Sequence, residues 1–150
     1  MGRRRGALMT TKREQILSQI ATALADTAGV SGRVYRSRVT ALARAESPAI
    51  IIEPVTDACQ QFTSLPKLDW TLRVRIVVTV RSNNAYTDAD SVIDSMHSKL
   101  MADLTLGGLA IDVQPSIVNF DFFDADKPAG VFSCEYEVLY RTSVADLTTE

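Results

Sequence analysis

The chain contains few residues whose types and spacing suit catalysis. It has one histidine, His97, which lies beside the apolar stripe of a segment with helical spacing and has no carboxylate or thiol partner apparent in the sequence. A lone helical histidine is usually structural or solvated. Gly107 and Gly108 lack the following Lys-Ser/Thr pair of a phosphate-binding loop. We therefore expect no catalytic residue and no cofactor.

Three aspartates, Asp121, Asp124 and Asp126, crowd one turn in which they could contact a cation. Calcium-binding loops need a ligand or a glycine at positions that Lys127 and Pro128 occupy here. Aspartate is also common in ordinary turns, because its side chain hydrogen-bonds the nearby backbone. The sequence therefore predicts a turn and no metal site.

The composition is that of an ordinary globular protein, with 46% hydrophobic residues, 23% charged residues and a net charge of −2. This balance gives no overall field directed at nucleic acid or at a membrane surface. No apolar run approaches the roughly 20 residues of a membrane span, and the run after Arg5 is too short for a signal peptide. Cys59 and Cys134 are expected to be free thiols in a reducing cytoplasm, where we expect the protein to stay.

Alternation of apolar and polar residues singles out residues 69–81 as the organising element. Strict alternation over this length predicts a long β-strand with one buried and one solvated face. Further strands are predicted at 49–52, 110–123 and 131–142. Pro115 indicates that the third of the four strands lies at an edge or contains a bulge. The apolar positions of the long strand are Trp70, Leu72, Val74, Ile76, Val78 and Val80.

Two stretches with apolar residues at helical spacing predict amphipathic helices. The first follows a capping box formed by Thr11 and Glu14 and ends at Gly29. The second follows a similar pair, Thr87 and Asp90, and ends before two consecutive glycines. Both helices have one polar face, so each is expected to lie on a core rather than within one.

These elements predict an α/β (α+β) fold in two layers. Four mainly antiparallel strands form a sheet in the order 1-2-4-3, and the two amphipathic helices lie on one face. Residues 1–10 form a flexible basic arm, residues 11–142 a single domain and residues 143–150 a polar tail. The arm contains Arg3, Arg4 and Arg5, which could touch nucleic acid or an acidic partner, although such blocks usually stay solvated.

The connections at 55–67 and 124–130 are predicted to lie at opposite ends of the sheet. The first contains about 13 residues, which is long for a compact domain, and long loops are often functional. Phe62 and Leu65 in the first connection suit docking on a protein surface, or the loop folds back over the sheet edge.

Alternating charges give the clearest candidate site. Arg73 and Arg75 lie on the polar face of the long strand, and Glu135 and Glu137 lie on the polar face of the last strand. If the two strands are antiparallel neighbours, these residues form a cross-strand ladder, with about 0.2–1 kcal/mol for each pair. The same charges could instead pair across a subunit boundary, and the sequence leaves both readings open.

Several segments together resemble the tail terminator proteins of long-tailed bacteriophages, also called tail completion or minor tail U-type proteins. The resemblance covers about Arg13 to Thr142 and follows the order of elements with scattered matching residues. The matching segments are R-V-Y-R-S-R at 33–38, S-P-A-I-I-I-E-P at 47–54, the W-x-L-x-V strand, A-Y-T-D-A-D at 85–90, L-G-G-L-A at 106–110 and Y-R-T at 140–142.

The resemblance implies a hexameric ring that caps the head-proximal end of the tail tube, ends tube polymerisation and provides the head-neck joining surface. It implies other copies of the chain, the tail tube protein and a head-completion protein as partners, with no membrane and no sequence-specific nucleic acid, although the genome passes through the lumen. The protein would be part of the virion and be assembled in the bacterial host cytoplasm. The candidate tube or neck contacts are Phe62, Leu65, Asp124, Asp126 and Lys127.

Two other kinds of function remain open at this point. The chain could be another neck or tail-tube component, or a ring protein of a phage-tail-like secretion system. It could also be a small ligand-binding α/β domain, although the scarcity of histidine and of clustered carboxylates argues against a polar pocket.

Overall fold

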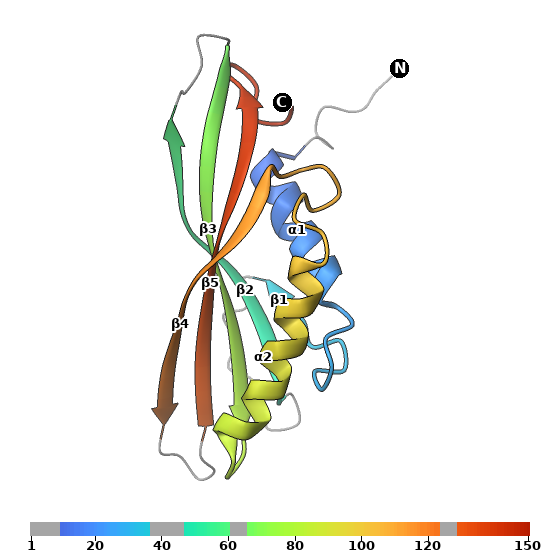
Figure 1. The fold of residues 1–150 in the computed structure, drawn as a ribbon, viewed down its shortest axis with the longest axis vertical. Helices are drawn as coiled ribbons and strands as arrows, with labels where there is room; N and C mark the ends of the chain where they lie inside the picture. Colours follow the sequence, from blue (N-terminus) through green and yellow to red (C-terminus); the bar gives the residue numbers. More distant parts are fainter. Residues whose placement is uncertain (1–9, 37–46, 61–65, 124–128) are drawn as a thin grey trace.

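The computed structural model describes residues 10–36, 47–60, 66–123 and 129–150. Five strands form one sheet, and two helices pack on one of its faces (Figure 1). The predicted α+β class is confirmed. In chain order the elements are α1 Lys12–Leu24, β1 Val34–Arg36, β2 Ala49–Gln60, β3 Lys67–Arg81, α2 Ala85–Met101, β4 Asp112–Phe123 and β5 Ala129–Ser143.

The sheet has the order β1-β2-β3-β5-β4. It differs in detail from the predicted four-stranded sheet of order 1-2-4-3, because β1 adds a fifth, parallel strand beside β2. The backbone N–H of Ile50 donates to the carbonyl of Arg33, and Arg36 of β1 forms an ion pair with Glu14 of α1. This ion pair lowers the pKa of Glu14. The short strand is thus held by contacts that are distant in sequence.

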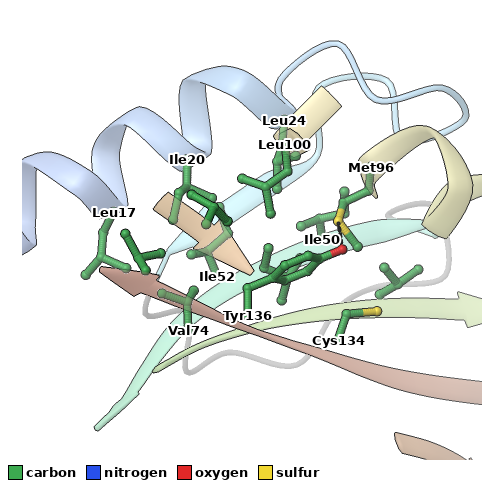
Figure 2. Close-up of a cluster of buried hydrophobic side chains, with 14 of the residues drawn as sticks. Leu17, Ile20, Leu24, Ile50, Ile52, Val74, Met96, Leu100, Cys134 and Tyr136 are labelled. Carbon is green, nitrogen blue, oxygen red and sulfur yellow. Dashed lines mark hydrogen bonds between the residues drawn. The ribbon is translucent and has the colours of Figure 1, made fainter. Parts of the chain in front are cut away.

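The central strand β3 confirms the alternation read from the sequence. Leu72, Val74, Ile76 and Val78 are fully buried, and β3 pairs antiparallel with both β2 and β5. Apolar residues of β2, β4 and β5 on the same face complete the layer of side chains that the sheet contributes to the core. Figure 2 shows how Leu17, Ile20 and Leu24 of α1 and Met96 and Leu100 of α2 close over this layer.

The strand β2 is longer than predicted and corrects the expected loop at 55–67. It continues through Pro54 to Gln60 and pairs with β3 as far as Asp69. A register irregularity between Pro54 and Thr56 accommodates the proline. The residues that follow are mostly exposed, so they lack the apolar alternation by which a strand is recognised.

The helix boundaries also differ from the prediction. The Thr11 side chain accepts a hydrogen bond from the backbone of Glu14, as a cap does, but α1 ends at Leu24, before Gly29. The Thr27 hydroxyl donates to the Leu24 carbonyl and so satisfies one of the last backbone acceptors. The capping box assigned to residues 87 and 90 is wrong, because α2 begins at Ala85 and both residues lie inside it.

Residues 61–65 connect β2 to β3, and residues 124–128 connect β4 to β5. The strand termini joined by these two connections lie at opposite ends of the sheet (Figure 1). The last residues of the chain fold back over the start of α1. The Lys12 backbone N–H donates to the Leu147 carbonyl, and Val144 donates to the carbonyl of Pro66. The segment assigned to a polar tail therefore has backbone contacts with the domain.

Val92 tests the assignment of the helix face. It is 2% exposed on the sheet side of α2, so Val92→Asp would bury an unpaired carboxylate or force it to bind a proton. We expect a loss of several kcal/mol out of the about 5–15 kcal/mol that such a domain holds. Urea unfolding followed by circular dichroism measures the change.

Ser98→Asp is the matched control for this variant. It introduces the same residue on the exposed side of the same helix, and we expect it to shift the unfolding free energy by about 0.5 kcal/mol or less. Equal unfolding midpoints for the two variants would show that the helix face is assigned wrongly.

Candidate functional site

The four predicted ladder residues meet on the face of the sheet that no described helix covers. Arg73 lies directly opposite Glu137, and Arg75 lies directly opposite Glu135. The Arg73 guanidinium contacts both carboxylates, with Nη2 2.9 Å from Glu137 Oε1 and Nη1 3.1 Å from Glu135 Oε1. Within this chain the ladder therefore joins β3 to β5.

The ladder extends over further strands. Arg75 lies 3.8 Å from Glu135 and 3.5 Å from Glu53 of β2. Arg73 also donates a hydrogen bond of 3.1 Å to the hydroxyl of Ser116 in β4. The charged and polar contacts thus tie together all four long strands across the open face.

The position of the ladder coincides with an irregular row of the sheet. One row of paired residues, here called the proline row, crosses β2, β3, β5 and β4. It consists of Pro54, Val74, Tyr136 and Pro115 in that order. A register irregularity follows the proline on each outer strand, and such bulges bend a strand and increase its twist. The two arginines occupy the rows on either side of the proline row.

Burial distinguishes the two glutamates. The Glu135 side chain is 13% exposed and contacts two guanidinium groups, whereas the Glu137 side chain is 34% exposed and contacts one. A desolvated carboxylate depends more on its partners, because water cannot replace them. Glu135 is therefore the central residue of the ladder.

A second polar cluster joins α1 to the part of β2 that was predicted as a loop. The Asp57 carboxylate accepts hydrogen bonds from Arg13, at 2.7 Å, and from the Tyr140 hydroxyl, and its side chain is 8% exposed. Arg13 lies over the ring of Trp70, which stacks on Tyr140. The hydrogen bond to Asp57 raises the pKa of Arg13, and burial, with Asp57, raises that of Tyr140.

A groove of about 630 Å³ lies between α2 and β4. It is lined by residues including Asp94, His97, Val118, Cys134 and Tyr136. His97 Nδ1 lies 2.7 Å from the Tyr136 hydroxyl, and the two rings stack.

This arrangement does not activate a nucleophile. Burial raises the pKa of the Cys134 thiol to about 11, so this side chain is a neutral thiol near pH 7. Burial likewise raises the pKa of Tyr136. The hydrogen bond and the ring stacking hold the His97 side chain against Tyr136.

The proposed contact residues Phe62, Leu65, Asp124, Asp126 and Lys127 lie outside the described residues, as does the arm at 1–9. Asp121, at the exposed end of β4, is the one member of the aspartate turn that the structure describes. Within the described ranges, no group of three or more histidine, cysteine, aspartate or glutamate side chains is placed to hold a metal ion.

No protein-family model matches the chain, and no curated protein matches it either. The described part of the chain also contains no helix of the length and apolarity that crossing a membrane would require.

The unequal burial of the glutamates can be measured with double-mutant cycles. We expect the coupling energy of Arg73 with Glu135 to be about 1 kcal/mol or more and that with Glu137 about 0.5 kcal/mol or less, because exposed pairs contribute little. Each residue is replaced by alanine singly and in pairs, and urea unfolding gives the free energies. Equal couplings would contradict the assignment of Glu135 as the central residue.

The two cysteines are expected to differ in reactivity. Cys59 is exposed and Cys134 is buried. With a pKa of about 11, Cys134 would be about one part in a thousand thiolate at pH 8, and the thiolate is the form that reacts. We expect iodoacetamide at pH 8 to label one thiol in the native protein and two in urea, as measured by mass spectrometry. Equal labelling rates in the native protein would contradict this.

Proposed function

We propose that this chain is a tail terminator of a long-tailed bacteriophage, which assembles into a hexameric ring and caps the head-proximal end of the tail tube. The proposal begins from the resemblance of residues 13–142 to that family. The ring ends tube polymerisation and presents its other face to the head-neck joint. No residue of the chain is assigned a catalytic role.

The observation that carries the proposal is a long sheet with a strand hairpin at each end. Strands β3 and β5 each contain 15 residues, which corresponds to about 50 Å at about 3.3 Å per residue. A subunit of this shape can present one hairpin to the tube and the opposite one to the neck. Phe62 and Leu65 belong to one connection, and Asp124, Asp126 and Lys127 belong to the other.

The exposed apolar residues support assembly with other protein chains. Ile117, Val118 and Phe120 of β4 are 50%, 42% and 58% exposed, and Tyr86 at the start of α2 is 59% exposed. Val118 and Phe120 share the helix face of β4, and the ring of Tyr86 lies 5.9 Å from that of Phe120, so these residues form a contiguous exposed apolar patch, and such patches mark interaction surfaces. Another neck or tube component, or a secretion-ring protein of the same build, would share this feature.

The groove between α2 and β4 favours a second candidate, a small ligand-binding domain. Its volume is within the range of small-molecule pockets, and His97 and Asp94 provide polar groups. Such a domain would remain a monomer at high concentration, whereas the terminator forms a hexamer. Native mass spectrometry distinguishes the two.

The capping activity is tested with the tail-tube subunit encoded in the same genome. We expect tubes polymerised with this protein to stop at a regulated length, with a ring at one end, when they are viewed by electron microscopy. The double variant Phe62→Ser, Leu65→Ser should still form hexamers but should lose capping, because it removes the apolar side chains proposed to dock on the tube.

The variant Leu104→Ser is the matched control, because it replaces an exposed apolar side chain that lies outside both connections and both sheet edges, and it should cap normally. Tubes that grow without limit in the presence of wild-type hexamers would refute the terminator function.

A further inference from the structure

The outer side of β4 is an unusual sheet edge. The strand pairs with β5 on one side, and no described residue pairs with it on the other. Ile117 projects on the open face of the sheet, and Val118 and Phe120 project on the helix face, as their partners on β5 show. Proteins usually protect a long edge with charges or with a covering element. From Ile117 to Phe120 this edge has neither charge nor proline.

The opposite side of the sheet has a second open edge. The strand β1 pairs only with residues 50–52 of β2, and β2 continues to Gln60 with no strand on its outer side among the residues described. The residues of this outer half, 54–60, are exposed except for Asp57, whose side chain is 8% exposed. Backbone N–H and C=O groups along such an edge are available to another strand.

The directions of the two edges match. Three antiparallel pairings separate β2 from β4, so the two strands run in opposite directions. A second copy of the chain placed beside β4 with its sheet in the same orientation would therefore present its β2 antiparallel to β4. This is the type of pairing that already joins the four long strands.

The proline row sets similar limits on both edges. Beyond Pro54, residues 55–60 of β2 contain no proline, and beyond Pro115, residues 116–123 of β4 contain none. Proline cannot donate a backbone hydrogen bond, so these are the continuous stretches of each edge. The two stretches lie on opposite sides of the proline row, and their pairing shifts neighbouring copies along the strands. A sheet that closes on itself requires such a stagger.

We infer that residues 116–123 of one copy pair with residues 55–60 of a second copy as antiparallel strands, and that this edge-to-edge contact builds the ring. The partner is another copy of this same chain. Because the two contact surfaces differ, the contact is head-to-tail, and repetition of a head-to-tail contact closes into a ring when the rotation permits. This inference rests on the proposed function and adds the surfaces by which the ring forms.

Cys59 provides a test at the native edge. It projects on the helix face of the sheet, opposite Trp70, and it is exposed. Val118→Cys and Phe120→Cys each place a second thiol on the same face of β4, and Asn119→Cys, the matched control, places one on the other face. Disulfides form when the Cα atoms lie within about 4.4–6.8 Å, so residues directly opposite each other on paired strands qualify, and two positions two residues apart on β4 cover two registers.

Under mild oxidation, we expect Val118→Cys or Phe120→Cys to give a ladder of covalent oligomers that ends at the hexamer on a non-reducing gel. Addition of Cys59→Ser should abolish at least nine-tenths of the ladder, and Asn119→Cys should give no more cross-linking than the wild type. Cys134 is buried and does not contribute.

Dimers that form without Cys59 would overturn the inference, because they indicate that β4 pairs with β4 of a second copy. The absence of cross-links at both helix-face positions would overturn it as well. Native mass spectrometry and the capping assay on the wild-type protein separate the two proposals. Hexamers that cap tubes but do not cross-link would contradict the proposed interface alone. Cross-linked hexamers that fail to cap would contradict the proposed terminator function alone.

Discussion

The antiparallel pairing of β3 with β5 is the constraint on which the rest of the structure depends. Its register runs without interruption from Lys67 opposite Ser143 to Arg81 opposite Ala129. Side chains alternate between the two faces, so this register places the apolar residues of both strands under the helices and the arginines opposite the glutamates. A slip of one residue would reverse both outcomes. The core and the charge ladder are therefore two consequences of a single alignment.

Residues 54–60 of β2 need contacts from elsewhere in the chain, because α2 packs mainly over β3 and β5 and covers little of β2. The Asp57 carboxylate provides them by accepting hydrogen bonds from α1 and β5 at once. Trp70 adds stacking on Tyr140 and donates a hydrogen bond of 2.9 Å to the Thr142 hydroxyl. These contacts fix residues 54–60 of β2 and the paired end of β3 to the rest of the domain. The same residues of β2 form its open edge.

The parts of the fold that were predictable from the sequence are those with a repeating local signal. Alternation located β3 and β5 to within two residues at each end, and it placed the two arginines and the two glutamates of the ladder on the polar faces of these strands. The pairing of Arg73 with Glu137 came only from the register of the sheet. Residues 55–60 of β2 escaped prediction because all of them except Asp57 are exposed, so they show no apolar alternation, and because Pro54 resembles a strand end. The Asp57 cluster depends on Arg13, which is 44 residues away, and no local pattern encodes such a contact.

The contrast between the open face and the β4 edge favours the edge over the open face as the surface for the proposed association. On the open face, Arg73 and Arg75 already pair with glutamates of the same chain. A partner that covered this face would have to desolvate ion pairs that are already formed, and the gain from doing so is small. The β4 edge is different, because its apolar side chains and its unpaired backbone groups both gain from contact with another strand. The proposed association through the edges would therefore leave the ladder in water.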